Sequence, residues 1–382
     1  MIKSYVVASR EIDDVEAVVN EVLSKLDIEK NLLKNSLGII TCFSEFVDTG
    51  AVKAVCEALP FDCIGSTTTI CSSAKETDQV LFALTVLTSD DCHFVTSLIP
   101  VGENYDEDIA STLTSLLKNN PGKPELVLGY FPLMRMISGD MLLASINKLI
   151  DDTPLFGTVA TDHTMDYTTA CTIHNGNAYR EAVALCFIYG QVNYSFEIAS
   201  LDEDMIKKQR AIITESNGNL LTGVNGKTAQ EYLEEIGITK SELESGIGII
   251  PLVIDHKNGT RPVARAAFGL TPDGHVVCGG SMPIGATIAI GRVKADDVIS
   301  TITNALTNFV EKDCLIISYS CMARFIALGL NHTAEADKMS ELVGDTNYLF
   351  ANSGGEICPL PDVNGKLRNY FHNFTNVFCK IK

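Results

Sequence analysis

The sequence lacks several features by which common classes of protein are recognised. It contains no tryptophan, and its 29 Lys and Arg residues are outnumbered by 48 Asp and Glu, which gives a net charge of −19. This charge opposes non-specific binding to nucleic acid or to an anionic membrane surface. No apolar run is long enough to span a membrane, and the N-terminus has no signal-peptide core. We therefore expect a cytoplasmic protein that binds no nucleic acid and does not insert into membranes.

Signatures of metal binding and catalysis are also missing. None of the 12 cysteines forms a C-x-x-C pair, so we expect them to be small core residues in a reducing compartment and predict no metal site. A G-x-S-x-G elbow would need glycine where Pro283 stands, and a phosphate-binding loop would need glycine in place of Leu221. The sequence therefore offers no catalytic residue by an established motif, and an enzyme is not the favoured interpretation.

Residues 314–329 are predicted to form a strand, a tight turn and a helix. The apolar run 315–317 is short and β-prone, whereas apolar residues recur at helical spacing over 322–328. The N-terminus of a helix offers free N–H groups and the positive end of a dipole. Because Arg324 lies in the first turn of this helix, we expect the segment to bind an anion.

The same pattern occurs a second time, at residues 125–140. Tyr130 aligns with Tyr319 and Arg135 with Arg324, each pair separated by 189 positions without a gap, and weaker matches flank both copies in the same order. Strand–helix units of similar composition can also resemble one another by chance. The ordered matches favour an internal duplication, that is, two related halves.

The element pattern predicts an α/β fold of the mixed α+β kind, with antiparallel ribbons and helical crossovers in each half. Strands and helices alternate as far as residue 68, whereas 79–88 and 92–99 are successive apolar runs joined by a turn. Residues 201–225 are charged and rich in turn formers. We therefore predict domains at 1–200 and 226–382, with 201–225 as a linker.

Four groups of residues are candidates for ligand binding. They share small, polar or charged side chains placed at predicted strand ends and loops. Each also has a structural interpretation: a surface arginine beside a buried thiol, a turn with a solvated carboxylate, an asparagine satisfied by backbone groups, or a capped turn. The candidates are Arg324 with Cys321 and its counterpart Arg135; Gly355 with Glu356; His372 with Asn373; and Ser66 with Thr67.

These residues also carry a resemblance to a known family. The runs Cys321…Arg324, Gly355-Glu356-Ile357 and His372-Asn373 resemble the end of a FIST C domain, and the stretch from Asn225 resembles its beginning. Cys63 to Thr68 is similar to a FIST N segment. The sequence departs from the family where Gly354 replaces a frequent aromatic residue.

The resemblance implies a sensory protein rather than an enzyme. FIST regions are attached to signalling modules, and small ligands such as amino acids have been proposed for them. We therefore expect a stand-alone protein that binds an amino acid or a related small anionic metabolite between its two domains. Arg324 is expected to bind the anionic group and Glu356 the amine. Because the chain leaves no room for an output domain, the expected partner is separate, such as a histidine kinase or a cyclic-dinucleotide enzyme.

Two alternatives remain open. A subgroup that resembles nitric-oxide sensors binds haem through a histidine, and His93, His163, His174 and His372 would be the candidates here, beside the Cys358-Pro359 dipeptide. Otherwise, Cys321 at a helix N-terminus could be an activated nucleophile. We predict no bound cofactor and keep haem as the alternative.

Overall fold

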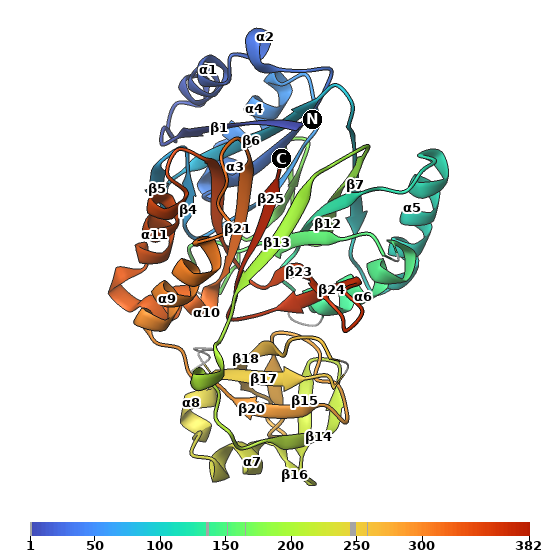
Figure 1. Ribbon diagram of the computed structural model, residues 1–382, viewed down its shortest axis with the longest axis vertical. Coiled ribbons are helices and arrows are strands. Elements are labelled where there is room, and N and C mark those ends of the chain that lie inside the picture. The colour runs from blue at the N-terminus through green and yellow to red at the C-terminus, as the bar shows by residue number, and fades with distance from the viewer. Residues whose placement is uncertain (1, 135–136, 151, 165, 245–249, 258) are drawn as a thin grey trace.

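The protein consists of a large body and a smaller domain inserted into it, as seen in a computed structural model (Figure 1). The structure describes residues 2–134, 137–150, 152–164, 166–244, 250–257 and 259–382. The body contains three six-stranded sheets, each with one parallel pair among antiparallel neighbours. The predicted mixed α/β class, with antiparallel ribbons and helical crossovers, is confirmed. Among the described helices, none is both long and apolar enough to cross a membrane.

The body is built from three consecutive units with the same order of elements. Unit 1 comprises β1 (Ile2–Ser9), α1 (Val15–Leu26), α2 (Ile28–Asn31), β2 (Asn35–Cys42), α3 (Glu45–Asp48), α4 (Ala51–Ala58), β3 (Cys63–Thr67), β4 (Cys71–Ser73), β5 (Glu76–Asp78) and β6 (Phe82–Ser89). Unit 2 comprises β7 (His93–Pro100), α5 (Tyr105–Asn119), β8 (Leu126–Phe131), α6 (Gly139–Ile150), β9 (Leu155–Val159), β10 (Thr172–His174), β11 (Asn177–Tyr179) and β12 (Ala182–Tyr189). Unit 3 comprises β13 (Tyr194–Ala199), α9 (Ala295–Leu306), β21 (Leu315–Cys321), α10 (Met322–Leu328), the 3₁₀ helix η2 (Gly329–Asn331), α11 (Ala334–Val343), β22 (Asn347–Ser353), β23 (Glu356–Pro361), β24 (Leu367–His372) and β25 (Asn376–Ile381).

The three sheets have equivalent strand orders. Sheet 1 runs β11-β10-β3-β2-β6-β1, sheet 2 runs β24-β23-β9-β8-β12-β7, and sheet 3 runs β5-β4-β22-β21-β25-β13. Each sheet thus receives a hairpin from another unit: β4–β5 of unit 1 joins sheet 3, β10–β11 of unit 2 joins sheet 1, and β23–β24 of unit 3 joins sheet 2. The strand orders are thus equivalent in three units, whereas the internal duplication inferred from the sequence stays a prediction. The predicted copies, at 125–140 and 314–329, contribute the central strands β8 and β21.

The strand registers show that individual residues occupy equivalent positions in the three sheets. The first residue of each received hairpin pairs with the third strand of its sheet: Thr172 with Ser66, Glu356 with Thr158, and Cys71 with Ala351. The central strands place Thr41, Tyr130 and Tyr319 opposite these third-strand residues. Two positions earlier, Ile39, Leu128 and Ile317 all lie in one central hydrophobic core. The inner faces of the three sheets therefore pack against one another.

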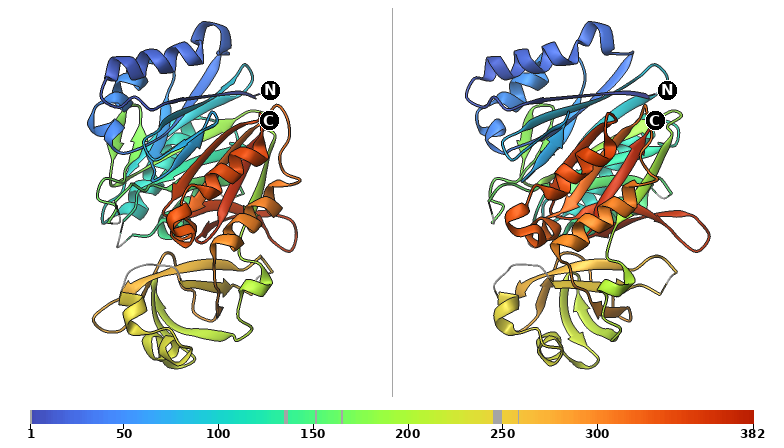
Figure 2. Two further views of the ribbon diagram at one scale, coloured as in Figure 1. Left: turned by 90° about the vertical axis from the view of Figure 1, so that its left-hand side faces the viewer. Right: turned by 60° about the vertical axis from the view of Figure 1, so that its left-hand side comes forward.

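Helices cover the outer face of each sheet. Helix α1 illustrates the sequence signals: Asp14 caps it by accepting a hydrogen bond from Ala17 N, and its buried face is formed by Val18, Val22 and Leu26. With α4 it packs on sheet 1, whereas α5 and α6 pack on sheet 2, and α9 and α11 on sheet 3. Figures 1 and 2 show these helices on the outside of the body.

The inserted domain separates β13 from α9. It comprises the 3₁₀ helix η1 (Glu203–Met205), β14 (Ala211–Asn217), β15 (Leu220–Val224), β16 (Lys227–Thr228), α7 (Ala229–Glu235), α8 (Lys240–Glu244), β17 (Ile250–Asp255), β18 (Val263–Leu270), β19 (Val276–Cys278) and β20 (Thr287–Ile290). Its strands run β14-β20-β17-β18-β19-β15-β16, and pairing of β14 with β15 closes this sheet on itself. The domain lies at one end of the body, away from the two chain ends (Figures 1 and 2).

The segment 201–225, which we predicted to be a linker, is folded. It supplies η1 and the hairpin β14–β15, which turns at Gly218 and Asn219. A two-residue turn with glycine at its first position, here with a φ of 58°, is typical of a tight hairpin, so the turn-rich composition marks a change of strand direction. The predicted domain 226–382 likewise divides between this inserted domain and unit 3.

Candidate functional site

The carboxyl ends of the parallel strand pairs meet where the body faces the inserted domain. Buried hydroxyl groups connect the three units there. Thr67 Oγ1 donates to Thr161 O at 2.7 Å, Thr68 Oγ1 donates to Asn352 O at 2.9 Å, and Thr158 Oγ1 lies 2.7 Å from Ser353 Oγ. Open α/β sheets commonly bind ligands beyond the carboxyl ends of their strands. We call this region the junction and place the predicted residues relative to it.

Glu356 is the one carboxylate among the three equivalent hairpin positions, and it is fully buried at the junction. Its Oε2 accepts a hydrogen bond from Thr375 Oγ1 at 2.7 Å, whereas no partner of good geometry lies at Oε1 among the described residues. Burial raises the pKa of Glu356 well above the usual value for glutamate, an effect opposed by Thr375 and by the neighbouring Cys321 thiol. The environment therefore favours the neutral acid.

Cys321 ends β21 beside Glu356 and is 3% exposed. Burial, followed by the charge of Glu356, raises the pKa of this thiol well above its usual value. A nucleophilic cysteine requires a lowered pKa and access to substrate. This environment opposes the alternative of an activated Cys321.

Arg324 is occupied by an ion pair within unit 3 and does not face an open site. Its Nη2 lies 2.7 Å from Glu335 Oε1, and the two side chains are 3% and 2% exposed. The same nitrogen donates to Val298 O and Thr301 Oγ1, both at 3.1 Å. A ligand anion at Arg324 would have to displace Glu335. Its repeat partner Arg135 lies outside the described residues.

Asn373 joins the body to the inserted domain. Its Oδ1 accepts a hydrogen bond from Ala266 N at 3.3 Å, and it forms an isolated β-bridge with Ala264. The amide nitrogen Nδ2 is buried without a partner among the described residues. The neighbouring His372 is 3.0 Å from Cys358 O through Nε2, and burial lowers its pKa to about 4, so it is neutral near pH 7.

The remaining predicted residues have structural roles. A Cβ atom at Gly355 would lie 2.1 Å from Phe371 Cζ, so this glycine permits close packing of the ring. Thr67 Oγ1, besides donating to Thr161, accepts a hydrogen bond from Cys171 N at 3.0 Å. Ser66 is buried on β3 opposite Thr172. Ser66, Thr67, Gly355, Glu356, Cys321 and Asn373 thus line or approach the junction, whereas Arg324 lies behind it.

Arg265 makes contacts between the inserted domain and the body that we did not predict from the sequence. This buried residue of β18 donates through Nη1 to Phe371 O at 2.7 Å, and its Nη2 lies 3.4 Å from Asp140 Oδ2. The same Asp140 oxygen accepts from Ser281 N at 2.8 Å. These bonds hold the inserted domain against α6 and β24. Because the inserted domain was not predicted, no sequence pattern indicated that Arg265 pairs with Asp140.

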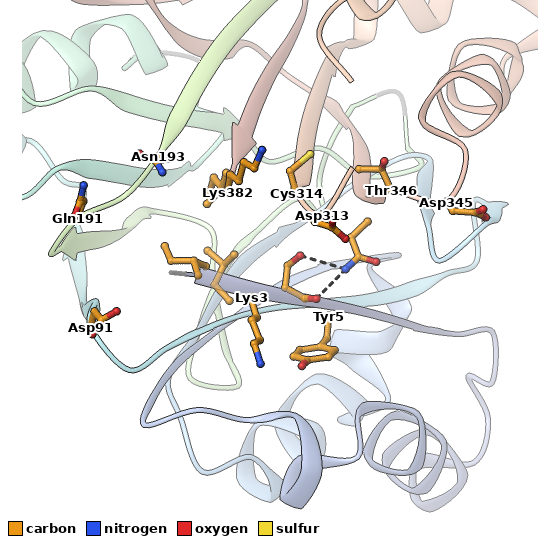
Figure 3. A pocket seen from close by; sticks show the side chains of 15 residues that line it. Lys3, Tyr5, Asp91, Gln191, Asn193, Asp313, Cys314, Asp345, Thr346 and Lys382 are labelled. Carbon is orange, nitrogen blue, oxygen red and sulfur yellow. Dashed lines mark hydrogen bonds between the residues drawn. The ribbon is translucent and has the colours of Figure 1, made fainter. Parts of the chain in front are cut away.

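A hollow lies between sheets 1 and 3, and residues from both ends of the chain, including Lys3 and Lys382, line it (Figure 3). Its volume is about 900 Å³, and Asn347 Nδ2 crosses its floor to donate to Ser4 O at 2.8 Å. It is lined by Ile2, Lys3, Ser4, Tyr5, Leu87, Asp91, Gln191, Asn193, Asp313, Cys314, Asp345, Thr346, Asn347, Ile381 and Lys382. No predicted site residue lies in it.

The histidines considered for haem are dispersed. His93 stacks on Tyr189, His163 Nδ1 lies 3.3 Å from Ser44 Oγ, and His174 Nε2 lies 3.2 Å from Thr96 Oγ1. Among the described residues, no three His, Cys, Asp or Glu side chains gather as metal ligands. Haem binding stays an untested alternative to the predicted absence of a cofactor.

Comparison with protein families places this chain. The family model for the FIST N domain matches residues 36–227, and that for the FIST C domain matches 228–359. The chain belongs to the FIST family. FIST domains are sensory and signal-transduction domains, so the predicted family and its general role are confirmed. The border between the two FIST matches falls in β16, inside the inserted domain.

Solved structures show weaker similarity to this FIST protein. A cyanuric acid hydrolase from A. caulinodans shares 8% identity, with a TM-score of 0.40, over 100% of this chain and 99% of the other. Phosphoribosylformylglycinamidine synthase II from Thermotoga maritima shares 9% identity, with a TM-score of 0.18, over 100% of this chain and 71% of the other. No match was found among curated proteins.

Proposed function

We propose that this FIST protein is a sensor that binds a small amine-bearing ligand, such as an amino acid, at the junction. The supporting observation is the buried Glu356 carboxyl group, whose Oε1 has no partner of good geometry among the described residues. Leaving a buried polar group unpaired costs about 1–3 kcal/mol, which a ligand amine would recover. An amine is the natural partner because it donates hydrogen bonds and carries positive charge.

Asn373 supplies the complementary group in this proposal. Its Nδ2 is a buried donor without a partner among the described residues, two positions before the Thr375 that binds Glu356. An acceptor and a donor so close in the chain fit the ammonium and carboxylate ends of an amino acid. In this role Asn373 replaces Arg324, whose charge is neutralised by Glu335.

Ligand binding at the junction would couple to the inserted domain. Asn373 accepts from Ala266, and Arg265 binds Phe371 O, so both contacts connect the inserted domain to the end of β24 and the residue that follows it. A ligand shifts a conformational equilibrium by its difference in affinity for the two states. We propose that the ligand changes how this domain sits on the body, and that a separate partner, such as a histidine kinase or a cyclic-dinucleotide enzyme, responds.

The test is a thermal-shift screen of the full chain against the twenty amino acids and simple amines. At 100 times its Kd a ligand stabilises the folded state by about 2.7 kcal/mol. We expect Glu356→Gln to weaken binding at least tenfold, because the neutral amide cannot balance the ammonium charge. Glu341→Gln, at an exposed position on α11, is the matched control. Absence of any stabilising amine, or equal binding by Glu356→Gln, would refute the proposal.

A further inference from the structure

Another hollow runs along β13, between sheet 3 and the hairpin β23–β24. Its volume is about 580 Å³, within the usual range for binding sites in proteins. One wall is β13 and the other is β23 with the start of β24, and Arg261 of the inserted domain stands at the rim. It is lined by Tyr194, Ser195, Phe196, Glu197, Ile198, Arg261, Pro359, Leu360, Pro361 and Leu367. We call it the β13 groove.

The backbone of β13 presents to this groove groups that no strand pairs with in the part of the chain that the structure describes. β13 is the edge strand of sheet 3, paired only with β25. Lys382 N donates to Asn193 O at 2.9 Å, which shows that odd-numbered residues face β25. In an antiparallel pair the hydrogen-bonding direction alternates along the strand. Tyr194, Phe196 and Ile198 therefore direct their N–H and C=O groups into the groove.

A side chain takes the place of a neighbouring strand at one position. Ile198 N donates to the adjacent Glu197 Oε1 at 2.9 Å. The equivalent edge strand of unit 1 is β1. There the blocking group comes from another unit, because Asn347 of β22 donates a hydrogen bond to Ser4 O. Unpaired edges are a template for a further strand unless they are blocked. At β13 the block is a single local carboxylate that a main-chain carbonyl can replace.

The opposite wall is apolar and also lacks a strand partner. β23 pairs with β9 only at Glu356 and Ile357, so its later residues leave that side open. Pro359, Leu360 and Pro361 follow there, and Leu367 of β24 stands beside them. Pairing of main chains gives affinity in strand addition, and pockets for alternate side chains give specificity.

We propose that the β13 groove binds an extended segment of a partner protein as an added strand. Its backbone pairs with Tyr194, Phe196 and Ile198, and alternate apolar side chains pack against Leu360 and Leu367. A carboxylate of the segment faces Arg261, an exposed cation in a chain of net charge −19. This surface is separate from the junction, so the inference does not depend on the proposed ligand.

The test begins with a random decapeptide display library selected on the immobilised full chain. Enriched peptides are synthesised, and their binding is measured by fluorescence anisotropy, with hydrogen exchange of the β13 amides. We expect alternating apolar sequences that contain an acidic residue and that slow exchange at Phe196 and Ile198. Arg261→Glu, at an exposed position, is expected to weaken binding at least tenfold, and Arg261→Lys to retain it.

A backbone variant gives an independent check. Ile198→Pro removes the N–H that faces the groove but leaves the β13–β25 ladder intact, and proline is tolerated on edge strands. Ile198→Val is its matched control and is expected to bind as the wild type does. No enrichment over an unrelated protein, or unchanged binding by both Arg261→Glu and a folded Ile198→Pro, would overturn the inference.

Discussion

Tyr130 Oη lies 2.7 Å from Tyr319 Oη, and the two rings meet edge-to-face with their centroids 6.2 Å apart. The residues are separated by 189 positions and occupy the same register position in units 2 and 3. In unit 1 that position is held by Thr41, whose buried Oγ1 has no partner among the described residues. The repeat thus brings its own copies into contact at the centre of the body.

The tyrosine pair should be energetically coupled. Tyr130→Phe leaves the buried Tyr319 hydroxyl without its partner, and we expect a loss of about 1–3 kcal/mol in the free energy of unfolding. The double variant with Tyr319→Phe should lose less than the sum, with a coupling of about 0.5–3 kcal/mol measured by urea unfolding. Strict additivity would show that the hydroxyls do not interact.

The Arg324–Glu335 ion pair should contribute to the stability of the fold and not to ligand binding. Arg324→Ala leaves a buried carboxylate uncompensated, and we expect a loss of about 3–5 kcal/mol in the free energy of unfolding. Replacing both residues by apolar side chains, as in Arg324→Met with Glu335→Leu, should recover only part of that loss, because Ser320 Oγ and Asn376 Nδ2 then lose Glu335 as their acceptor. Denaturant titration of the three proteins checks this. If Arg324→Ala kept full stability and lost only ligand binding, Arg324 would be a ligand contact after all.

Glu356 should make stability fall as pH rises. Its pKa is raised by burial in the folded state, so its contribution is complete below the pKa of an unfolded glutamate and is lost as pH rises through the folded value. Glu356→Gln, which cannot ionise, should therefore gain stability relative to the wild type between about pH 5 and about pH 8. Urea unfolding at both pH values measures the difference. A constant difference would mean that Glu356 does not titrate there.

Ligand binding should also release protons if Glu356 receives the amine. A cation beside the carboxyl group lowers its pKa, so the acid ionises as the ligand enters. Calorimetry of a stabilising amino acid in buffers with different ionisation enthalpies is expected to show release of up to about one proton per site. Glu356→Gln removes this proton. If the wild-type protein binds the ligand without releasing a proton, the amine does not bind at Glu356.

Gly355 should tolerate no side chain. In Gly355→Ala the new Cβ would meet the Phe371 ring, and overpacking of this kind costs about 1–3 kcal/mol in stability. Gly102→Ala is the control, because nothing lies within 4 Å of its added Cβ. Thermal unfolding of both variants gives the comparison. Equal stability would show that Phe371 moves aside freely.

The parts of the fold that could be predicted depend on local patterns. Apolar residues at helical spacing identify α1, and the copies at 125–140 and 314–329 reveal two equivalent strands from a shared run of residue types. The third copy was missed because Thr41 stands where the other units carry tyrosine. The inserted domain was missed because its first hairpin contains the turn formers by which linkers are also recognised.

The candidate site could be predicted only in part, for a similar reason. Sequence patterns drew attention to Glu356, which follows a pair of glycines, and to Asn373, which precedes the last strand. The structure places both residues at the junction. The partner of Arg324 could not be foreseen, because Glu335 lies in the next helix and is brought back only by the packing of α11 on sheet 3. Pairings of this kind are set by tertiary packing, which a single sequence does not display.

The exchange of hairpins among the units has a consequence for synthesis on the ribosome. All strands of sheet 1 have been synthesised once unit 2 has emerged. Sheet 2 also needs β24, which ends at His372. The hairpin β4–β5 can pair only after β21, β22 and β25 of sheet 3 have been synthesised. Sheets 2 and 3 therefore stay incomplete until β23–β25 have been synthesised, and a protein cut short before β23 would leave two of its three body sheets unfinished.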